Sequence, residues 1–441
     1  MHIRLFSTFG LSFFTCTLVF FCNPSPGSAQ STGNTKPNIL IYIADDQYKT
    51  SIGCYGAKPS YTPNIDKLAE EGIRFTHCFT PSSICTPNRG VLLSGMYPLK
   101  NGAHPNHSGF YDGVKSLPNY MKELGYRACI VGKDGIQKPS DFYEWEFRIK
   151  KSDEHVPGAD EPKHDRHRKS RFDEIEKFIN DKDSRPFCIF HAASLPHSPL
   201  LNKMPNGLKG YDANNYYMDF ELGKYRELLQ KYGAEENTIV IYVNDNEAQQ
   251  DRTKNTLYDT GINIPMIVRW PEHIKAGTTT NVMVSTLDIL PTLLEIAGGE
   301  IPEILDGKSM LGVWEGKTGS LHDKLFFSYT GVIVSSNRQE TPFPIRAVRT
   351  DRYKYIRYLN YTIGHPKLKD KIFPAEELFD LQYDPEEKNN LANSPELAKI
   401  KQNLSADVDD WMRSMNDQGI ASEEEALRRY PPGKNDEEEE E

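Results

Sequence analysis

The stretch Asn38-Ile39-Leu40-Ile41-Tyr42-Ile43-Ala44-Asp45-Asp46 is a short apolar run that ends in two adjacent aspartates. A bounded apolar run of this length predicts a buried strand. Two neighbouring carboxylates at a strand end repel each other, so Asp45 and Asp46 indicate either a solvated turn or a site for a divalent cation. A hard cation takes carboxylate oxygens as ligands and offsets their repulsion.

The same pattern returns later in the chain. Residues 237–243 form another apolar run, and Asn244-Asp245-Asn246 follows it with a carboxylate and an amide oxygen. Up to about residue 300 such runs alternate with helical segments, for example 64–71 and 117–124, each ended by a glycine. This alternation predicts an α/β fold with a mostly parallel sheet sandwiched by helices. Ligands bind beyond the carboxyl ends of strands in such sheets, so both polar groups are candidate site residues.

The sequence changes character after about residue 320. Aromatic and β-branched residues there predict a small antiparallel sheet with strands at 325–329, 346–348 and 353–358. A helix over 395–412 is expected to pack on this sheet. The expected domains are a catalytic domain over 30–319, a smaller α+β subdomain over 320–430 and an acidic disordered tail over 431–441.

The hexapeptide Cys85-Thr86-Pro87-Asn88-Arg89-Gly90 contains the pattern Cys-x-Pro-x-Arg. A lone cysteine is most often a small buried apolar residue. In this pattern, however, the chain resembles the type I sulfatases, and the resemblance runs from about Pro37 into the C-terminal region. It implies an alkaline-phosphatase-like fold and a Cys85 that a maturation enzyme oxidises to formylglycine (3-oxoalanine), whose hydrated aldehyde attacks sulfur. We expect Cys85 at the N-terminus of a helix over 87–93, because proline suits a first turn.

The resemblance also implies the roles of the other site residues. One Ca²⁺ is expected to be held by oxygen ligands from Asp45, Asp46, Asp245, Asn246 and the modified Cys85. The expected catalytic residues are Cys85, Arg89, Lys133 and His197. The expected substrate-binding residues are Lys133, His197 and Lys254. Lys133 and His197 each come at or after the end of a predicted strand, at 127–133 and 186–191.

One departure from the family pattern concerns a histidine. The family reads Gly-Lys-x-His where this chain has Gly132-Lys133-Asp134-Gly135, so the residue credited with taking a proton from the sulfated diol is absent. His104 or His107 could substitute for it. Two smaller departures leave the metal ligands in place: Asn244 stands where the family usually has Ser or Thr, and Glu247 where it has Gly.

The segments 343–350 and 352–355 resemble the heparan N-sulfatase (sulfamidase) branch of the family. The expected function is a hydrolase that removes sulfate from a sulfated carbohydrate, either a glycosaminoglycan or an algal polysaccharide. One alternative is a sulfatase-like glycan-binding protein, which the absent histidine favours and the intact Cys85 motif opposes. Another is a phosphatase or phosphodiesterase of the same superfamily. Those enzymes commonly hold two zinc ions with several histidines, which are not evident in this sequence.

The N-terminus predicts a secreted or periplasmic protein. Arg4 precedes the apolar stretch 5–21, and Gly27-Ser28-Ala29 offers small residues for cleavage, so residues 1–29 are expected to be a signal peptide cut near Ala29. A membrane anchor is the alternative, but polar residues interrupt the stretch and no later segment is long and apolar enough to span a bilayer. Disulfide pairing among the cysteines that follow cannot be read from sequence.

The net charge of −10 looks unsuited to a polyanionic substrate, but the acidic residues of 436–441 account for six of these charges. The polar segment 148–171 is rich in Lys, Arg and His. It indicates either a solvated basic loop or an electrostatic guide for a sulfated chain. No nucleic-acid-binding module is recognised, so nucleic acid is not an expected partner.

Overall fold

The computed structural model describes residues 36–133, 143–149, 172–201, 204, 206–250, 252–334, 340–361 and 374–429. The predicted signal peptide, the acidic tail, Gly135 and all but the first two residues of the basic segment 148–171 lie outside the described residues. A single unit begins at Lys36 and includes both sheets. The domain boundary proposed between residues 319 and 320 stays a prediction.

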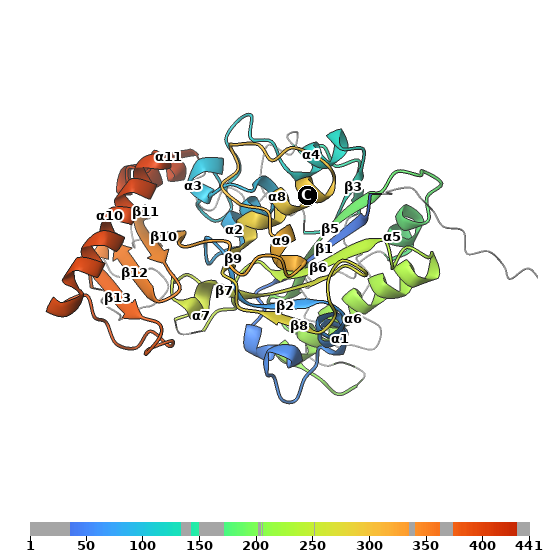
Figure 1. The fold of residues 1–441 in the computed structure, drawn as a ribbon, viewed down its shortest axis with the longest axis horizontal. Coiled ribbons are helices and arrows are strands. Elements are labelled where there is room, and N and C mark those ends of the chain that lie inside the picture. Colours follow the sequence, from blue (N-terminus) through green and yellow to red (C-terminus); the bar gives the residue numbers. More distant parts are fainter. Residues whose placement is uncertain are drawn as a thin grey trace, which may run out of the picture. The chain divides into compact units, whose positions relative to one another are not determined.

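Within the described residues, nine strands form the central sheet (Figure 1). They are β1 (Asn38–Asp45), β2 (Ile73–Phe79), β3 (Arg127–Gly132), β4 (Phe147–Ile149), β5 (Phe187–Pro196), β6 (Thr238–Asn244), β7 (Asn263–Arg269), β8 (Thr278–Thr280) and β9 (Val284–Ser285). Their order is β4-β3-β5-β1-β6-β7-β2-β8, with β9 beside β2. The five neighbouring strands β4, β3, β5, β1 and β6 pair in parallel, whereas β7 runs antiparallel to β6 and β2. The predicted mostly parallel sheet is confirmed.

Helices cover both faces of this sheet, and the side chains of β1 alternate between two cores. Leu40 and Tyr42 pack in a core formed with α1 (Pro63–Glu71), α5 (Phe172–Ile179) and α6 (Gly210–Lys231). Ile39 and Ile41 pack in the opposite core, formed with α2 (Cys85–Ser94), α4 (Leu117–Glu123) and α8 (Ile289–Ile296). Each of these β1 side chains is fully buried, and burying one aliphatic side chain contributes about 1.5–3 kcal/mol. The sandwich therefore fixes β1 on both sides.

Shorter helices connect these layers. The helices predicted over 64–71 and 117–124 are observed as α1 and α4, with small differences at their ends. The remaining short elements are α3 (Pro98–Asn101), α7 (Asp259–Ile262), α9 (Leu311–Trp314) and the 3₁₀ turns η1 (Lys49–Ser51), η2 (Gly53–Tyr55), η4 (Thr286–Asp288) and η6 (Pro395–Leu397). In the described part of the chain, no helix has the length and apolarity needed to cross a bilayer.

The C-terminal region forms a separate antiparallel sheet, as predicted. Its strands, in spatial order, are β10 (Leu325–Val334), β11 (Glu340–Arg349), β12 (Tyr353–Tyr358) and β13 (Glu376–Asp380). The predicted helix is observed as η6 followed by α10 (Ala398–Ser414), and Leu404 and Val408 of α10 pack on Val348 and Tyr355 of the sheet. The last helix, α11 (Ile420–Arg429), also contacts β11.

The other face of the small sheet packs against loops of the catalytic region. Phe327 and Tyr329 of β10 share a buried cluster with Ile84 and Leu257. The backbone N–H of Ser328 donates a hydrogen bond of 2.9 Å to the carbonyl of Pro81. The small sheet thus contacts the segment just before Cys85 and the segment just after Lys254.

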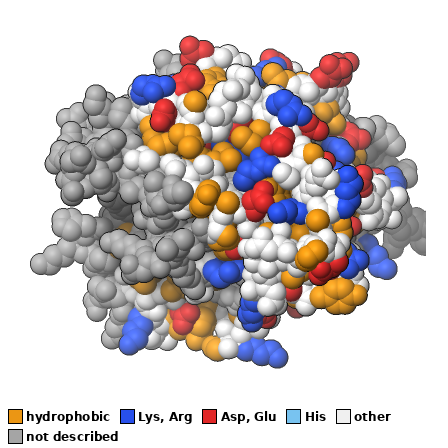
Figure 2. All heavy atoms as spheres, turned by 90° about the vertical axis from the view of Figure 1, so that its left-hand side faces the viewer, with side chains coloured by type: hydrophobic (Ala, Val, Ile, Leu, Met, Phe, Trp, Pro, Cys, Tyr) orange, Lys and Arg blue, Asp and Glu red, His pale blue; other side chains and the backbone are white. Residues whose placement is uncertain are grey.

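Figure 2 shows the side of Figure 1 on which α10 and β13 lie. Basic and acidic side chains are interspersed over the described part of this face, and no continuous basic surface is visible there. The cysteines Cys54, Cys78, Cys85, Cys129 and Cys188, all within the described residues, form no disulfide bond.

Candidate active site

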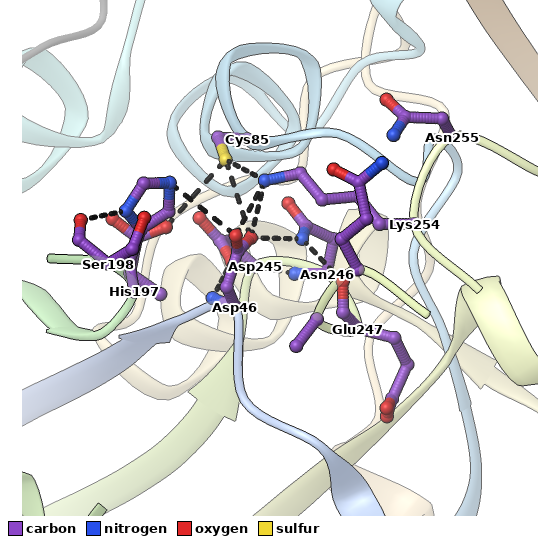
Figure 3. Close-up of polar contacts among 12 residues, drawn as sticks. Asp46, Cys85, His197, Ser198, Asp245, Asn246, Glu247, Lys254 and Asn255 are labelled. Atoms are coloured by element: carbon purple, nitrogen blue, oxygen red, sulfur yellow. Dashed lines mark hydrogen bonds and ion pairs between the residues drawn. The ribbon is translucent and has the colours of Figure 1, made fainter. Parts of the chain in front are cut away.

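The candidate residues meet at the carboxyl edge of the central sheet, as the strand pattern predicted. Asp45 is the last residue of β1, and Asp245 directly follows the neighbouring strand β6. Lys133 directly follows β3 and His197 directly follows β5. Figure 3 shows Asp46, Cys85, His197, Asp245, Asn246 and Lys254 directed toward one another. The topology thus brings together residues far apart in the sequence.

Cys85 is the first residue of α2, so the predicted helix starts slightly earlier than expected. Pro87 lies in its first turn, where a missing N–H costs nothing because no carbonyl of the preceding turn would accept from it. Gly95 ends the helix in a left-handed conformation, φ 64°, and its N–H donates to the carbonyl of Val91. All residues of α2 are buried. The helix therefore holds Cys85 in a fixed position.

The sulfur of Cys85 lies among charged groups of opposite sign. Its Sγ is 3.7 Å from Oδ1 of Asp45, 3.8 Å from Oδ1 of Asp46 and 3.4 Å from Nζ of Lys254. Lys254 Nζ also donates to both carboxylate oxygens of Asp46, at 2.6 Å and 2.7 Å. A group attached at residue 85 is therefore within reach of both an ammonium donor and carboxylate oxygens.

Arg89, one turn further along α2, connects the two acidic strand ends. Its Nε donates to Oδ2 of Asp245 at 3.0 Å, and its Nη2 lies 3.4 Å from Oδ2 of Asp45. Its Nη1 is buried without a hydrogen-bond partner. The side chain is 2% exposed, and a buried guanidinium needs such carboxylate partners.

The donor set fits a hard divalent cation. Within the described residues, one ligand atom from each of Asp45, Asp46, Cys85 and Asp245 lies within 4.8 Å of the others. The Oδ1 of Asn246 is buried and accepts no hydrogen bond, while its Nδ2 donates to Oδ1 of Asp46 at 2.7 Å. Three carboxylates and a free amide oxygen are the ligands that Ca²⁺ prefers, whereas zinc prefers His and Cys.

The pKa values of Asp45 and Asp245 move in opposite directions. Burial raises the pKa of Asp245, and the neighbouring charge of Asp45 raises it further. Burial also acts to raise the pKa of Asp45, but Lys133 and Arg89 lower it below its usual range. The three carboxylates of the site are balanced by Arg89, Lys133 and Lys254. A divalent cation would leave an excess of positive charge for an anionic substrate.

Lys133 and His197 are the more accessible members of the site. Lys133 Nζ lies 2.9 Å from Oδ2 of Asp45, and His197 Nε2 lies 3.5 Å from Oδ2 of Asp46. About a third of each side chain is exposed, 34% for Lys133 and 35% for His197. His197 Nδ1 is 2.6 Å from the carbonyl oxygen of Ser198, which can only accept. Nδ1 therefore carries a hydrogen, and Nε2 is the nitrogen available for proton exchange.

Two asparagines hold the site together through contacts that the sequence did not predict. Asn88 donates from Nδ2 to the carbonyl of Asp245 and accepts a 2.7 Å hydrogen bond from the hydroxyl of Thr286. Asn244 contacts the backbone on both acidic strand ends. Asn88 occupies a variable position of the Cys-x-Pro-x-Arg pattern, so no motif marked it.

The two histidines considered as substitutes for the absent family residue lie in different surroundings. His104 is buried, with Nε2 3.7 Å from Oε2 of Glu423 in α11. His107 is exposed, and its backbone N–H donates to the hydroxyl of Thr86 at 3.1 Å. The structure therefore brings the backbone of His107 to the side chain of Thr86, the residue that follows Cys85 in the sequence.

Two family models match this chain. The model described as Sulfatase covers residues 37–299. The model described as N-sulphoglucosamine sulphohydrolase, C-terminal, covers residues 251–414 and so includes Lys254 and the small sheet.

Similar proteins agree with these matches. An ulvan-active sulfatase of Formosa agariphila is 35% identical over 421 residues, which cover 87% of this chain and 81% of the relative. An N-acetylglucosamine-6-O-sulfatase of Bacteroides thetaiotaomicron is 22% identical, over 91% of each chain. A solved protein in complex with its substrate D-glucosamine-2-N,6-O-disulfate shares the fold, with a TM-score of 0.67 and 20% identity over 88% of this chain and 99% of that chain. The chain belongs to the type I sulfatase family, and it is a sulfate ester hydrolase with a sulfamidase-like C-terminal domain.

Proposed function

We propose that this protein removes sulfate from a sulfated carbohydrate with formylglycine at position 85 and one bound Ca²⁺. The observation that carries the proposal is the position of Cys85. It begins a buried helix, and its sulfur lies 3.4 Å from Lys254 Nζ and 3.7–3.8 Å from carboxylate oxygens of Asp45 and Asp46. A reacting group at this position is close to both the metal-ligand carboxylates and the ammonium of Lys254, which also contacts Asp46.

The unmodified cysteine is a poor nucleophile in this position. Burial raises the pKa of its thiol well above the usual range; Lys254 opposes that rise, but the carboxylates of Asp245 and Asp46 add to it. The thiolate is the reactive form of cysteine, so the thiol at neutral pH would be inert. Oxidation to formylglycine would replace it with a hydrated aldehyde whose hydroxyl can attack sulfur.

The metal site is assigned to Asp45, Asp46, Asp245 and Asn246. One ligand atom from each of the three aspartates lies within 4.8 Å of the others and of the Cys85 sulfur. The unpartnered Oδ1 of Asn246 would supply the neutral ligand. Ca²⁺ bound there would act as a Lewis acid on oxygens of the reacting centre. The protein holds these ligands in place through Arg89, which contacts Asp45 and Asp245.

The surrounding cations are assigned to the transferring sulfate group. Lys254 and Lys133 each offer an ammonium, which donates in several directions and offsets negative charge in the transition state. A sugar alkoxide is a poor leaving group, so departure needs a proton donor. His197 fits this role because Nε2 points into the site while Nδ1 is held by the carbonyl of Ser198. About a third of its side chain is exposed, so a sugar that arrives from solvent could contact it.

The substrate is assigned to sulfated polysaccharides or oligosaccharides. This assignment is supported by a relative named as ulvan-active and another named as acting on N-acetylglucosamine 6-O-sulfate. The sequence of 1–29 supports secretion or a periplasmic location, where such polymers are met. The C-terminal family match keeps N-sulfated glucosamine among the substrates to be tested.

The proposal is tested by measuring sulfate release after co-expression with a formylglycine-generating enzyme. The substrate panel contains sulfated ulvan oligosaccharides, glucosamine 6-O-sulfate, N-sulfoglucosamine and 2-O-sulfated uronic acid disaccharides. We expect sulfate release from at least one of them, and no phosphate release from matched phosphate esters. Binding without hydrolysis by protein with confirmed formylglycine would instead establish a sulfatase-like glycan-binding protein. Preferential phosphate release would establish a phosphatase.

A further inference from the structure

Asn244 lies between the two strand ends that carry the metal-ligand residues. It is the last residue of β6, and it pairs with Ala44, next to Asp45, in the neighbouring strand β1. Its side chain is fully buried.

The amide of Asn244 uses all of its hydrogen-bonding capacity on backbone groups of the two ligand-bearing segments. Its Nδ2 donates to the carbonyls of Gln47 and Asn246, both at 2.6 Å. Its Oδ1 accepts from the N–H of Gln47 at 3.3 Å and from the N–H of Asp245 at 3.1 Å. Each partner is a fixed donor or acceptor, so the orientation of the amide is determined.

Gln47 directly follows Asp46, and Asp46 has an unusual backbone. Its φ of 61° lies in the left-handed region, which costs a residue with a side chain about 1–3 kcal/mol. Such a conformation persists only where its surroundings hold it. Asn244 binds both the N–H and the carbonyl of Gln47, and so holds the turn immediately after Asp46.

The same amide holds the other ligand-bearing segment. It binds the N–H of Asp245 and the carbonyl of Asn246, the two ligand residues that follow it. The carboxylates on the two segments repel each other, so a connection between the segments is needed to keep their oxygens at coordination distance. Seryl or threonyl hydroxyls offer one donor and are too short to replace all four contacts.

We propose that Asn244 is a positioning residue that sets the spacing of the Ca²⁺ ligands across β1 and β6, an inference that rests on the proposed metal site. It does not touch the metal ligand oxygens of Asp46 or Asn246. It acts through the backbone groups of Gln47, Asp245 and Asn246, and its effect is on metal affinity rather than on folding alone.

The test compares Asn244→Asp and Asn244→Ser with the wild type in a Ca²⁺ titration of the chelator-treated, full-length protein. Asn244→Asp keeps the shape of the side chain but removes the N–H donors that face the carbonyls of Gln47 and Asn246. Asn244→Ser also removes these contacts but introduces no negative charge. The readouts are the Ca²⁺ dissociation constant from calorimetry and the Tm with and without Ca²⁺. We expect each variant to bind Ca²⁺ at least tenfold more weakly and to lose most of the Ca²⁺-dependent rise in Tm.

Asn101→Asp is the matched control, because Asn101 is also a buried amide with two donor contacts and one acceptor contact, to Ser94, Met96 and Ala103. It should lower the Tm of the metal-free protein without changing the Ca²⁺ dissociation constant. If Asn244→Asp does not fold, Asn244→Ser decides the question.

The outcomes separate the inference from the proposed function. A wild type that binds no Ca²⁺ overturns the metal site and this inference with it. A wild type that binds Ca²⁺, with Asn244 variants that bind it equally tightly, overturns the inference alone. Equal loss of Ca²⁺ affinity in Asn101→Asp also overturns it, because the effect would then be general destabilisation.

Discussion

Lys254 Nζ lies 2.6 Å and 2.7 Å from the two carboxylate oxygens of Asp46 and 3.4 Å from the sulfur of Cys85. This contact brings a residue of the loop after β6 to the end of β1. The loop is held from the side of the small sheet, since Tyr329 of β10 donates to Oδ1 of Asn255 at 3.2 Å. The C-terminal sheet therefore helps to build the site.

We predict that Lys254→Met lowers kcat/KM for sulfate release by about 10²–10³-fold, the range typical for losing one donor to transition-state charge. Methionine keeps the length of the side chain and removes its charge. Steady-state kinetics on the identified substrate check this. Lys324→Met, at an exposed lysine that pairs with Asp407, is the control and should leave activity unchanged. Activity of the Lys254 variant within a factor of about three of wild type would remove Lys254 from the site.

Tyr329→Phe should reduce kcat/KM by up to about tenfold, because one hydrogen bond contributes about 0.5–1.5 kcal/mol to holding Asn255 and thus Lys254. The ring stays in its buried cluster, so the fold is kept. Tyr355→Phe serves as the control, since that hydroxyl contacts Glu376, away from the Lys254 loop. Equal activity losses in both variants, together with equal losses of Tm, would contradict a positioning role for Tyr329.

Asp245→Ala should abolish sulfate release and the rise in Tm that Ca²⁺ produces. The substitution removes one ligand and leaves the buried guanidinium of Arg89 without its closest carboxylate. Breaking a buried ion pair costs about 3–5 kcal/mol, so the metal-free variant should also unfold at a lower temperature. Chelation of the wild type should reproduce the activity loss. An enzyme indifferent to both treatments would show that the cation site is misassigned.

Stability should depend on pH through Asp219, which accepts hydrogen bonds from the N–H groups of Asn64 and Ile65 at the start of α1. Burial raises the pKa of Asp219 to about 6, although these hydrogen bonds oppose the rise. The unfolded value is about 3.9. The folded protein therefore binds the proton more tightly, and this group adds stability at low pH that is lost as the pH rises through about 6.

Thermal denaturation between about pH 4.5 and about pH 7.5 tests this dependence. As the pH rises, the Tm of the wild type should fall relative to the Tm of Asp219→Asn, which cannot lose this proton. Asp212→Asn, at an exposed position of the same helix, should run parallel to the wild type over this range. A difference between wild type and Asp219→Asn that does not change with pH would show that Asp219 has an ordinary pKa.

Replacement of Gly135 by histidine should raise the steady-state rate, because the family places a proton acceptor there for the release of sulfate. In the wild type we expect a rapid first turnover of sugar followed by slower turnover. Rapid-mixing measurements of desulfated sugar check both statements. Fast turnover without a burst, unchanged in Gly135→His, would show that another group accepts the proton. The turnover rate of His107→Ala would then show whether His107, which lies beside Thr86, is that proton acceptor.

The central sheet and the positions of most candidate site residues could be predicted because the sequence patterns that indicate them are local. The apolar runs before Asp45 and Asp245 are continuous, and strand ends of a parallel sheet meet at one edge. A helix next to Cys85 was also predicted, over 87–93, from a short motif with proline in the first turn, and the observed α2 begins two residues earlier, at Cys85 itself. These predictions needed no knowledge of distant contacts.

The contacts of Asn244, Asn88 and Tyr329 could not be predicted in the same way. Each acts through partners that are distant in sequence, such as Gln47 for Asn244 and Thr286 for Asn88. An asparagine after a strand has many uses, and only the fold shows which backbone groups it meets. The placement of His104 beside Glu423 likewise depends on α11, which no local pattern connects to it.

The most direct test of the account measures sulfate release against the fraction of Cys85 converted to formylglycine. Mass spectrometry of the peptide that contains residue 85 gives this fraction, because conversion lowers the mass by about 18 Da. Samples are prepared with graded levels of the maturation enzyme and assayed on the same sulfated oligosaccharide. The account predicts a rate proportional to the converted fraction, with no activity at zero conversion. Sulfate release by fully unconverted protein, or none from fully converted protein on any substrate of the panel, would contradict it.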